Sequence, residues 1–110
     1  EQGKIKAFGV SNFLPFQVNA LRKYIPVSYN QIEFSVIHTQ PLTNGMLDNC
    51  LEHSIRPMAW APLGGGIIND DSHPHYRRIA ATAHQLAETY NTGINEILLA
   101  FILKHPSGVL

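Results

Sequence analysis

Polar and aromatic side chains stand at or near the ends of three short, mostly apolar runs of the sequence. They are Ser11 and Asn12 after the first run, Asn30 and Gln31 in the second, and Trp60 in the third. Hydroxyl and amide groups suit a planar carboxamide, which offers both donors and acceptors. A large aromatic side chain can stack on a flat ring. Together these residue types favour a ligand that carries a carboxamide and a flat ring.

A glycine run follows the third apolar run, in Pro62-Leu63-Gly64-Gly65-Gly66. Backbone N–H groups in such a run can approach phosphate groups closely. Taken alone the run is a weak signal, because it is neither GxGxxG nor followed by Lys and Ser or Thr. Its position after the strand-end residues is what supports a ligand-binding role for it.

Each of these residues also has a purely structural interpretation. Ser11 and Asn12 could cap the helix that follows them. Gln31 could be a hydrogen-bonded core amide, and Trp60 could be a core aromatic. The residues by themselves leave both interpretations open.

Other reactive side chains form poorer constellations. His73 and His75 lack a third metal ligand nearby, so we predict no metal site. Cys50 lies on an apolar helix stripe without a positioned base, which favours a core role. His38 follows the second run, and we expect it to pack in a loop.

The elements that must position the strand ends alternate between strand and helix. We predict strands over 5–10, 27–34 and 56–61, and helices over 15–25, about 44–54 and 76–90. A last helix should begin after an N-cap at Thr92 and include Ile94 to Ile102. Residues 69–74 should form a loop. Helical crossovers make the strands parallel, and ligands bind at the carboxyl ends of parallel strands. On the third helix we expect Ile79, Ala80, Ala83, Leu86, Ala87 and Tyr90 to be buried, and on the last one Phe101 among others.

Composition restricts the class of protein. The chain has 110 residues, 45% of them hydrophobic, and a formal net charge of zero, which argues against a nucleic-acid partner. No apolar run reaches the roughly 20 residues of a membrane span. One cysteine excludes an internal disulfide and fits a reducing compartment, so we expect a cytoplasmic protein without a membrane partner.

Three ordered motifs carry a resemblance to a known family. They are Gly9-Val10-Ser11-Asn12-Phe13, Asn30-Gln31-Ile32-Glu33 and Met58-Ala59-Trp60-Ala61-Pro62-Leu63-Gly64. In order and spacing they resemble the aldo/keto reductases, and Trp60-Ala61 with the glycine run is most similar to a bacterial oxidoreductase branch. The resemblance implies an α/β fold, a partial (β/α)8 TIM barrel with strands five to seven and the start of strand eight at Val109-Leu110. Residues 1–110 would be a C-terminal fragment of a single barrel domain.

The resemblance also implies a cofactor site. Ser11, Asn12 and Gln31 match the residues that bind the nicotinamide carboxamide. Trp60 stands where the family usually has a tyrosine that stacks on the nicotinamide. Leu63, Gly64 and Gly65 match the loop beside the pyrophosphate. The implied cofactor is NADP, with NAD not excluded, because the segment that grips the 2′-phosphate follows strand eight.

No catalytic residue can be assigned within the chain, because the family's aspartate, tyrosine, lysine and histidine come from strands two to four. The implied parent protein reduces aldehydes or ketones to alcohols, with a small carbonyl compound as substrate. Alternatives are a non-enzymatic nicotinamide-binding subunit or an inactive proteolytic remnant. The cut barrel would expose an inner face, for which we expect Phe8, Val10, Ile32 and Met58 or their neighbours. The fragment should therefore self-associate or pair with the missing part of the barrel.

Overall fold

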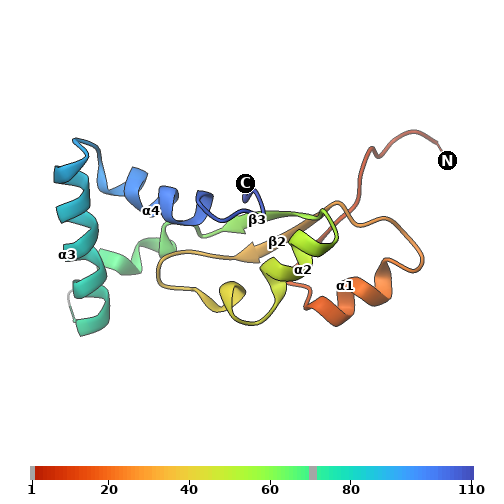
Figure 1. The fold of residues 1–110 in the computed structure, drawn as a ribbon, viewed down its shortest axis with the longest axis horizontal. Helices are drawn as coiled ribbons and strands as arrows, with labels where there is room; N and C mark the ends of the chain where they lie inside the picture. Colours follow the sequence, from red (N-terminus) through yellow and green to blue (C-terminus); the bar gives the residue numbers. More distant parts are fainter. Residues whose placement is uncertain (1, 70–71) are drawn as a thin grey trace.

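A computed structural model of the protein describes residues 2–69 and 72–110. Strands and helices alternate as predicted, with two additional 3-10 segments (Figure 1). The elements are β1 (Gly9–Ser11), α1 (Pro15–Leu21), β2 (Tyr29–Glu33), η1 (Gln40–Leu42), α2 (Met46–Glu52), β3 (Arg56–Trp60), η2 (Gly64–Asn69), α3 (Pro74–Thr89) and α4 (Ile94–Leu103). Each strand is shorter than predicted, and β1 in particular begins at Gly9 rather than at residue 5.

The strands form one parallel sheet in the order β1-β2-β3. Glu33 and Trp60, the last residues of β2 and β3, lie beside each other, and Ser11, the last residue of β1, lies beside Gln31. The strands therefore end at the same edge of the sheet, with β1 two residues shorter there. Leu110 returns to the free side of β3, where its N–H donates to the Pro57 carbonyl at 2.9 Å and its carbonyl accepts from Ala59 N–H at 2.8 Å. Leu110 therefore lies where a further parallel strand would begin.

Within residues 2–69 and 72–110, the helices that pack on the sheet cover one of its faces. Ile32 is 0% exposed and shares a core with Leu47 of α2 and Ile102 of α4. The alternate residues of β2 and β3 lie on the opposite face, where Gln31 and Met58 are exposed and Tyr29 and Glu33 are half-buried. An open face is unusual, because parallel sheets are normally covered on both sides.

The expectation that Val10 and Ile32 lie on the exposed inner face is wrong. Ile32 is fully buried, and Val10 packs against the cluster between α1 and α2. Met58 lies on the open face as expected and is 38% exposed. Phe8 is 47% exposed, but it precedes β1 and its exposure does not assign it to that face. The sequence did not show which alternate set of strand residues the helices would cover.

The helix boundaries follow from local hydrogen bonds. Pro15 begins α1, and the Gln17 side chain accepts a bond of 2.8 Å from the N–H of the N-cap residue Leu14. The prediction that Thr92 caps the last helix is wrong, because Gly93 is its N-cap. Thr92 N–H instead donates to the Ala87 carbonyl at 2.9 Å, so Thr92 belongs to the turn that ends α3.

The helices α3 and α4 pack on each other at one end of the molecule, away from β1 (Figure 1). Ala83 and Leu98 are buried between them. Leu86, Tyr90 and Phe101, for which we predicted burial, are 39%, 71% and 43% exposed. The predicted loop over 69–74 includes residues 70–71, which lie outside the described residues, and Pro74 already belongs to α3. Within residues 2–69 and 72–110, no helix has the length and apolar character needed to cross a membrane.

Candidate functional site

Hydrogen bonds bring the ends of all three strands together. The Trp60 indole N–H donates to the Asn12 side-chain oxygen at 3.0 Å, which joins residues 48 apart in sequence. The Asn12 backbone N–H donates to the Gln31 carbonyl at 2.7 Å. Asn12, Gln31 and Trp60 are therefore linked near the carboxyl edge of the sheet, and Ser11 lies beside Gln31. Of the side chains predicted to converge there, those of Asn12 and Trp60 contact each other.

Left-handed backbone turns the chain sharply after β1 and after β3. Asn12 has φ of 56° and Ala61 has φ of 48°. Asparagine tolerates this region better than most side chains, because its short amide can bond locally. The left-handed turn at Asn12 and the bond from Trp60 together fix where the Asn12 amide lies.

The structure decides one of the structural alternatives for these residues. Leu14 is the N-cap of α1, so neither Ser11 nor Asn12 caps that helix. Within the described chain the Gln31 side chain is exposed on the uncovered face of the sheet. Trp60 is 37% exposed, so much of its ring remains open to a ligand. The residues offer hydroxyl, amide and aromatic surfaces on the open side of the sheet.

The glycine run adopts three consecutive left-handed conformations, with φ of 70° at Gly64, 61° at Gly65 and 84° at Gly66. Gly64 is buried, and a Cβ there would lie 2.7 Å from Ile37 Cδ1. Its N–H donates to the Ala61 carbonyl at 2.8 Å. Gly65 and Gly66 face open space, so a ligand can approach their backbone closely.

Two residues near the strand ends were noted in the sequence but not assigned to the cofactor site. Asn30 is 1% exposed, and both ends of its amide bond the backbone of Phe13. His38 Nδ1 lies 3.5 Å from a carboxylate oxygen of Glu33, the last residue of β2. The Ser35 hydroxyl accepts from His38 N–H at 3.1 Å and holds that turn. Adjacent amides in one strand, which must face opposite sides, were the available signal for Asn30.

The remaining reactive groups lie apart from the strand ends. Cys50 is 1% exposed in the core between α1 and α2, and burial raises the pKa of its thiol to about 11. The ring of His73 stacks on Tyr76 with centroids 4.3 Å apart. The described part of the chain contains no group of three or more histidine, cysteine or acidic side chains placed to hold a metal ion.

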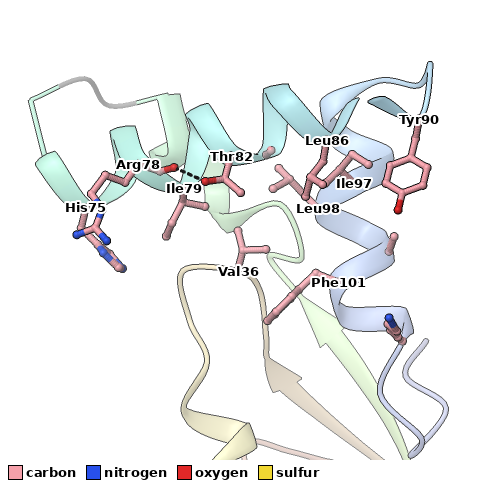
Figure 2. Close-up of a pocket in the computed structure, with 13 residues that line it drawn as sticks. Val36, His75, Arg78, Ile79, Thr82, Leu86, Tyr90, Ile97, Leu98 and Phe101 are labelled. Atoms are coloured by element: carbon pink, nitrogen blue, oxygen red, sulfur yellow. Dashed lines mark hydrogen bonds between the residues drawn. The ribbon is translucent and has the colours of Figure 1, made fainter. Parts of the chain in front are cut away.

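A groove of about 590 Å³ lies between α3 and α4 (Figure 2). Val36, Ile79, Leu98 and Phe101 point into it, and Arg78 lies toward one end. None of the strand-end residues lines it. The groove and the strand-end group are separate features.

Comparison with known proteins gives consistent matches. The family model described as "Aldo/keto reductase family" matches residues 1–110. The chain is 38% identical to oxidoreductase YdhF of Escherichia coli (strain K12) over 100% of the chain and 37% of that protein. It is 34% identical to a 6-dehydroglucose reductase of Agrobacterium fabrum (strain C58 / ATCC 33970) over 98% of the chain and 36% of that protein.

A solved structure gives the same result for the fold. The chain superposes on the thermostable aldo-keto reductase Tm1743, solved in complex with the inhibitor epalrestat, with a TM-score of 0.79 and 25% identity. The match covers 99% of this chain and 38% of that one. The chain thus spans little more than a third of the length of the relatives it matches.

Proposed function

The chain belongs to the aldo/keto reductase family, whose members are oxidoreductases, and on that premise we propose its role. We propose that it is the cofactor-contacting portion of an NADP(H)-dependent oxidoreductase that reduces aldehydes or ketones to alcohols. The relative from Agrobacterium fabrum is named for such a reduction. The family shares a nicotinamide cofactor, and the preference for NADP over NAD is part of the proposal.

The observation that carries the proposal is the bond from Trp60 Nε1 to Asn12 Oδ1. It brings an aromatic side chain beside an amide, and the Asn12 backbone N–H also bonds the carbonyl of Gln31, whose side chain is exposed. The Asn12 oxygen retains a second lone pair and its amide nitrogen has two donors, so the bond to Trp60 does not exhaust its capacity. A flat ring with a carboxamide would find both of its recognition groups here.

Each residue has a definite role in this proposal. Ser11, Asn12 and Gln31 would bond the carboxamide, and Trp60 would stack on the nicotinamide ring. Leu63, Gly64 and Gly65 would lie beside the pyrophosphate. The Gly64 N–H is already bonded to the Ala61 carbonyl, so it would not donate to the pyrophosphate. Gly64 would instead allow the pyrophosphate to approach the backbone closely.

The residues present fit a nicotinamide cofactor, since the amides and the ring are exposed on the uncovered face. When bound, the cofactor would supply hydride to the carbonyl carbon. The chain's own residues would hold the ring in one orientation, which is what positions a reacting group for transfer. The proton for the carbonyl oxygen would come from catalytic residues outside residues 1–110.

We also propose where the chain stands in a whole barrel. β1, β2 and β3 would be barrel strands five, six and seven, and Leu110 would begin strand eight. Two observations support this: the helices lie on one face only, and Leu110 bonds the free edge of β3. The uncovered face would then be the barrel interior, and the rest of the same barrel would be the chain's partner.

The test is NADPH oxidation by the complete protein with a panel of aldehydes and ketones, beside the 110-residue chain. We expect turnover from the complete protein only. The variant Asn12→Gly keeps the left-handed turn and removes the amide, so it should weaken NADPH binding. Asn91→Gly is the matched control, because Asn91 also has a positive φ, of 49°, but lies at the end of α3.

Two results would contradict the proposal. Nicotinamide binding without turnover of any carbonyl compound would favour a non-enzymatic binding subunit. Turnover by the isolated chain would show that a catalytic group lies within it.

A further inference from the structure

Asn30 makes an unusual pair of contacts for a side chain in the middle of a strand. It is 1% exposed and lies on the helix-facing side of β2. Its Nδ2 donates to the Phe13 carbonyl at 2.9 Å, and its Oδ1 accepts from the Phe13 N–H at 3.4 Å. The amide therefore satisfies both backbone groups of a residue 17 positions earlier in the chain.

Phe13 immediately follows Asn12, whose left-handed backbone begins the turn between β1 and α1. Two consecutive residues of β2 form hydrogen bonds with this turn. Gln31 accepts from the Asn12 N–H at 2.7 Å, and Asn30 holds the next residue. Because adjacent strand residues face opposite sides, the Gln31 side chain lies on the open face and the Asn30 side chain lies on the helix-facing side of the sheet.

We propose that Asn30 is a positioning residue of the nicotinamide site: it fixes Phe13 and thereby aims the Asn12 amide at the carboxamide and at Trp60. This inference rests on the proposed function. A left-handed turn at a non-glycine residue persists only where the surroundings hold it. The Asn30 amide holds the residue that follows Asn12, in addition to the bonds that Asn12 itself makes to Trp60 and Gln31.

Asparagine suits this role for a chemical reason. Its amide offers a donor and an acceptor side by side, which matches the C=O and N–H of one residue. Aspartate of the same shape only accepts when ionised, so the Phe13 carbonyl would lose its partner. Serine stays neutral but is too short to span both groups.

The experiment compares Asn30→Asp and Asn30→Ser with Asn49→Asp in the complete protein. Asn49 is a matched control, because it is 5% exposed and its Nδ2 donates to Asn19 Oδ1 at 3.1 Å, between α1 and α2. Calorimetric titration measures binding of NADP⁺ and of 2′-phospho-ADP-ribose, which lacks the nicotinamide, and thermal melts measure stability.

We expect both Asn30 variants to bind NADP⁺ about tenfold or more weakly, since a small misplacement of a positioning group has effects of this size. Their affinity for 2′-phospho-ADP-ribose should stay unchanged, because only the nicotinamide end meets Asn12. Asn49→Asp should lower the melting temperature without changing the ratio of the two affinities. A general loss of stability would weaken both ligands alike.

The outcomes separate the inference from the function on which it rests. If the unaltered protein binds neither NADP⁺ nor NAD⁺, the proposed function itself fails. If it binds them and the Asn30 variants keep the ratio of the two affinities, the positioning role is overturned and the function stands. Asn30→Ser decides the matter if the aspartate variant does not fold. A separate test is hydrogen exchange in the unaltered protein without nucleotide. The backbone amide of Phe13 should exchange slowly with solvent. Fast exchange would overturn the inference, whatever the variants show.

Discussion

Two separate constraints, the backbone conformation and the space around the residue, restrict position 64 to glycine. Its φ of 70° lies in the region that side chains disfavour, and its missing Cβ leaves the space that Ile37 fills. Gly65 shares the first constraint, with φ of 61°, but has nothing within 4 Å of a Cβ position. The two neighbours therefore separate backbone strain from packing.

Gly65→Ala should destabilise the protein by roughly 1–2 kcal/mol, the cost of a left-handed non-glycine residue. Gly64→Ala should lose about 1–3 kcal/mol more, because the added methyl group meets Ile37. Urea unfolding of both variants measures the difference, and Ile37→Ala combined with Gly64→Ala should recover part of it. Equal losses at the two positions would show that Ile37 moves aside freely.

Side-chain identities predicted the strand-end group but not its internal bonding. Asn12, Gln31 and Trp60 could be placed at one edge because parallel strands end together. The bond between Trp60 and Asn12 depends on the sheet register and on two left-handed turns, which no local pattern specifies. Asn30 was named with Gln31 as a strand-end amide, but its different role could not be predicted until the two faces of β2 were known.

The helices α3 and α4 show how much of helix burial can be predicted from helical periodicity. The pattern predicts both helices and the buried positions Ala83 and Leu98. It overestimates the apolar face that is actually covered, since Leu86, Tyr90 and Phe101 remain exposed around the groove (Figure 2). Periodicity reports which face is apolar, whereas burial depends on what lies opposite that face.

Leu98→Ala should lower stability by about 2–5 kcal/mol, because it leaves a cavity between α3 and α4. Leu103→Ala, in the last turn of the same helix, is the control. Leu103 is 56% exposed, against 2% for Leu98, so its truncation should change stability by no more than about 0.5 kcal/mol. Denaturant midpoints of the two variants check the prediction. A large effect at Leu103 would mean that another part of the protein covers the end of α4.

The whole molecule is more extended than a closed domain of its length. Its radius of gyration is 16.3 Å and its extents are 51 × 25 × 22 Å, whereas a compact domain of 100 residues has a radius of about 13 Å. Its accessible surface of 7393 Å² exceeds the roughly 6100 Å² expected for a folded monomer of this mass. Both quantities fit a chain that completes its fold against something else.

The isolated chain should therefore associate through the uncovered sheet face. Met58 lies on that face and is 38% exposed, so Met58→Glu should reduce association by placing a charge in the contact. Tyr24→Glu is the matched control, because Tyr24 is 85% exposed and follows α1, away from the face. Sedimentation of the three proteins distinguishes them. A stable monomer of the unaltered chain would contradict this view of the open face.

Nicotinamide binding at the carboxyl edge of the sheet can be tested by a crystal structure of the complete protein with bound NADP⁺. We predict that the carboxamide lies within hydrogen-bond distance of the Asn12 and Gln31 side chains, with the nicotinamide ring stacked on Trp60 and the pyrophosphate beside Leu63–Gly65. A nucleotide bound in the groove between α3 and α4, or one whose nicotinamide lies away from Trp60, would contradict the account.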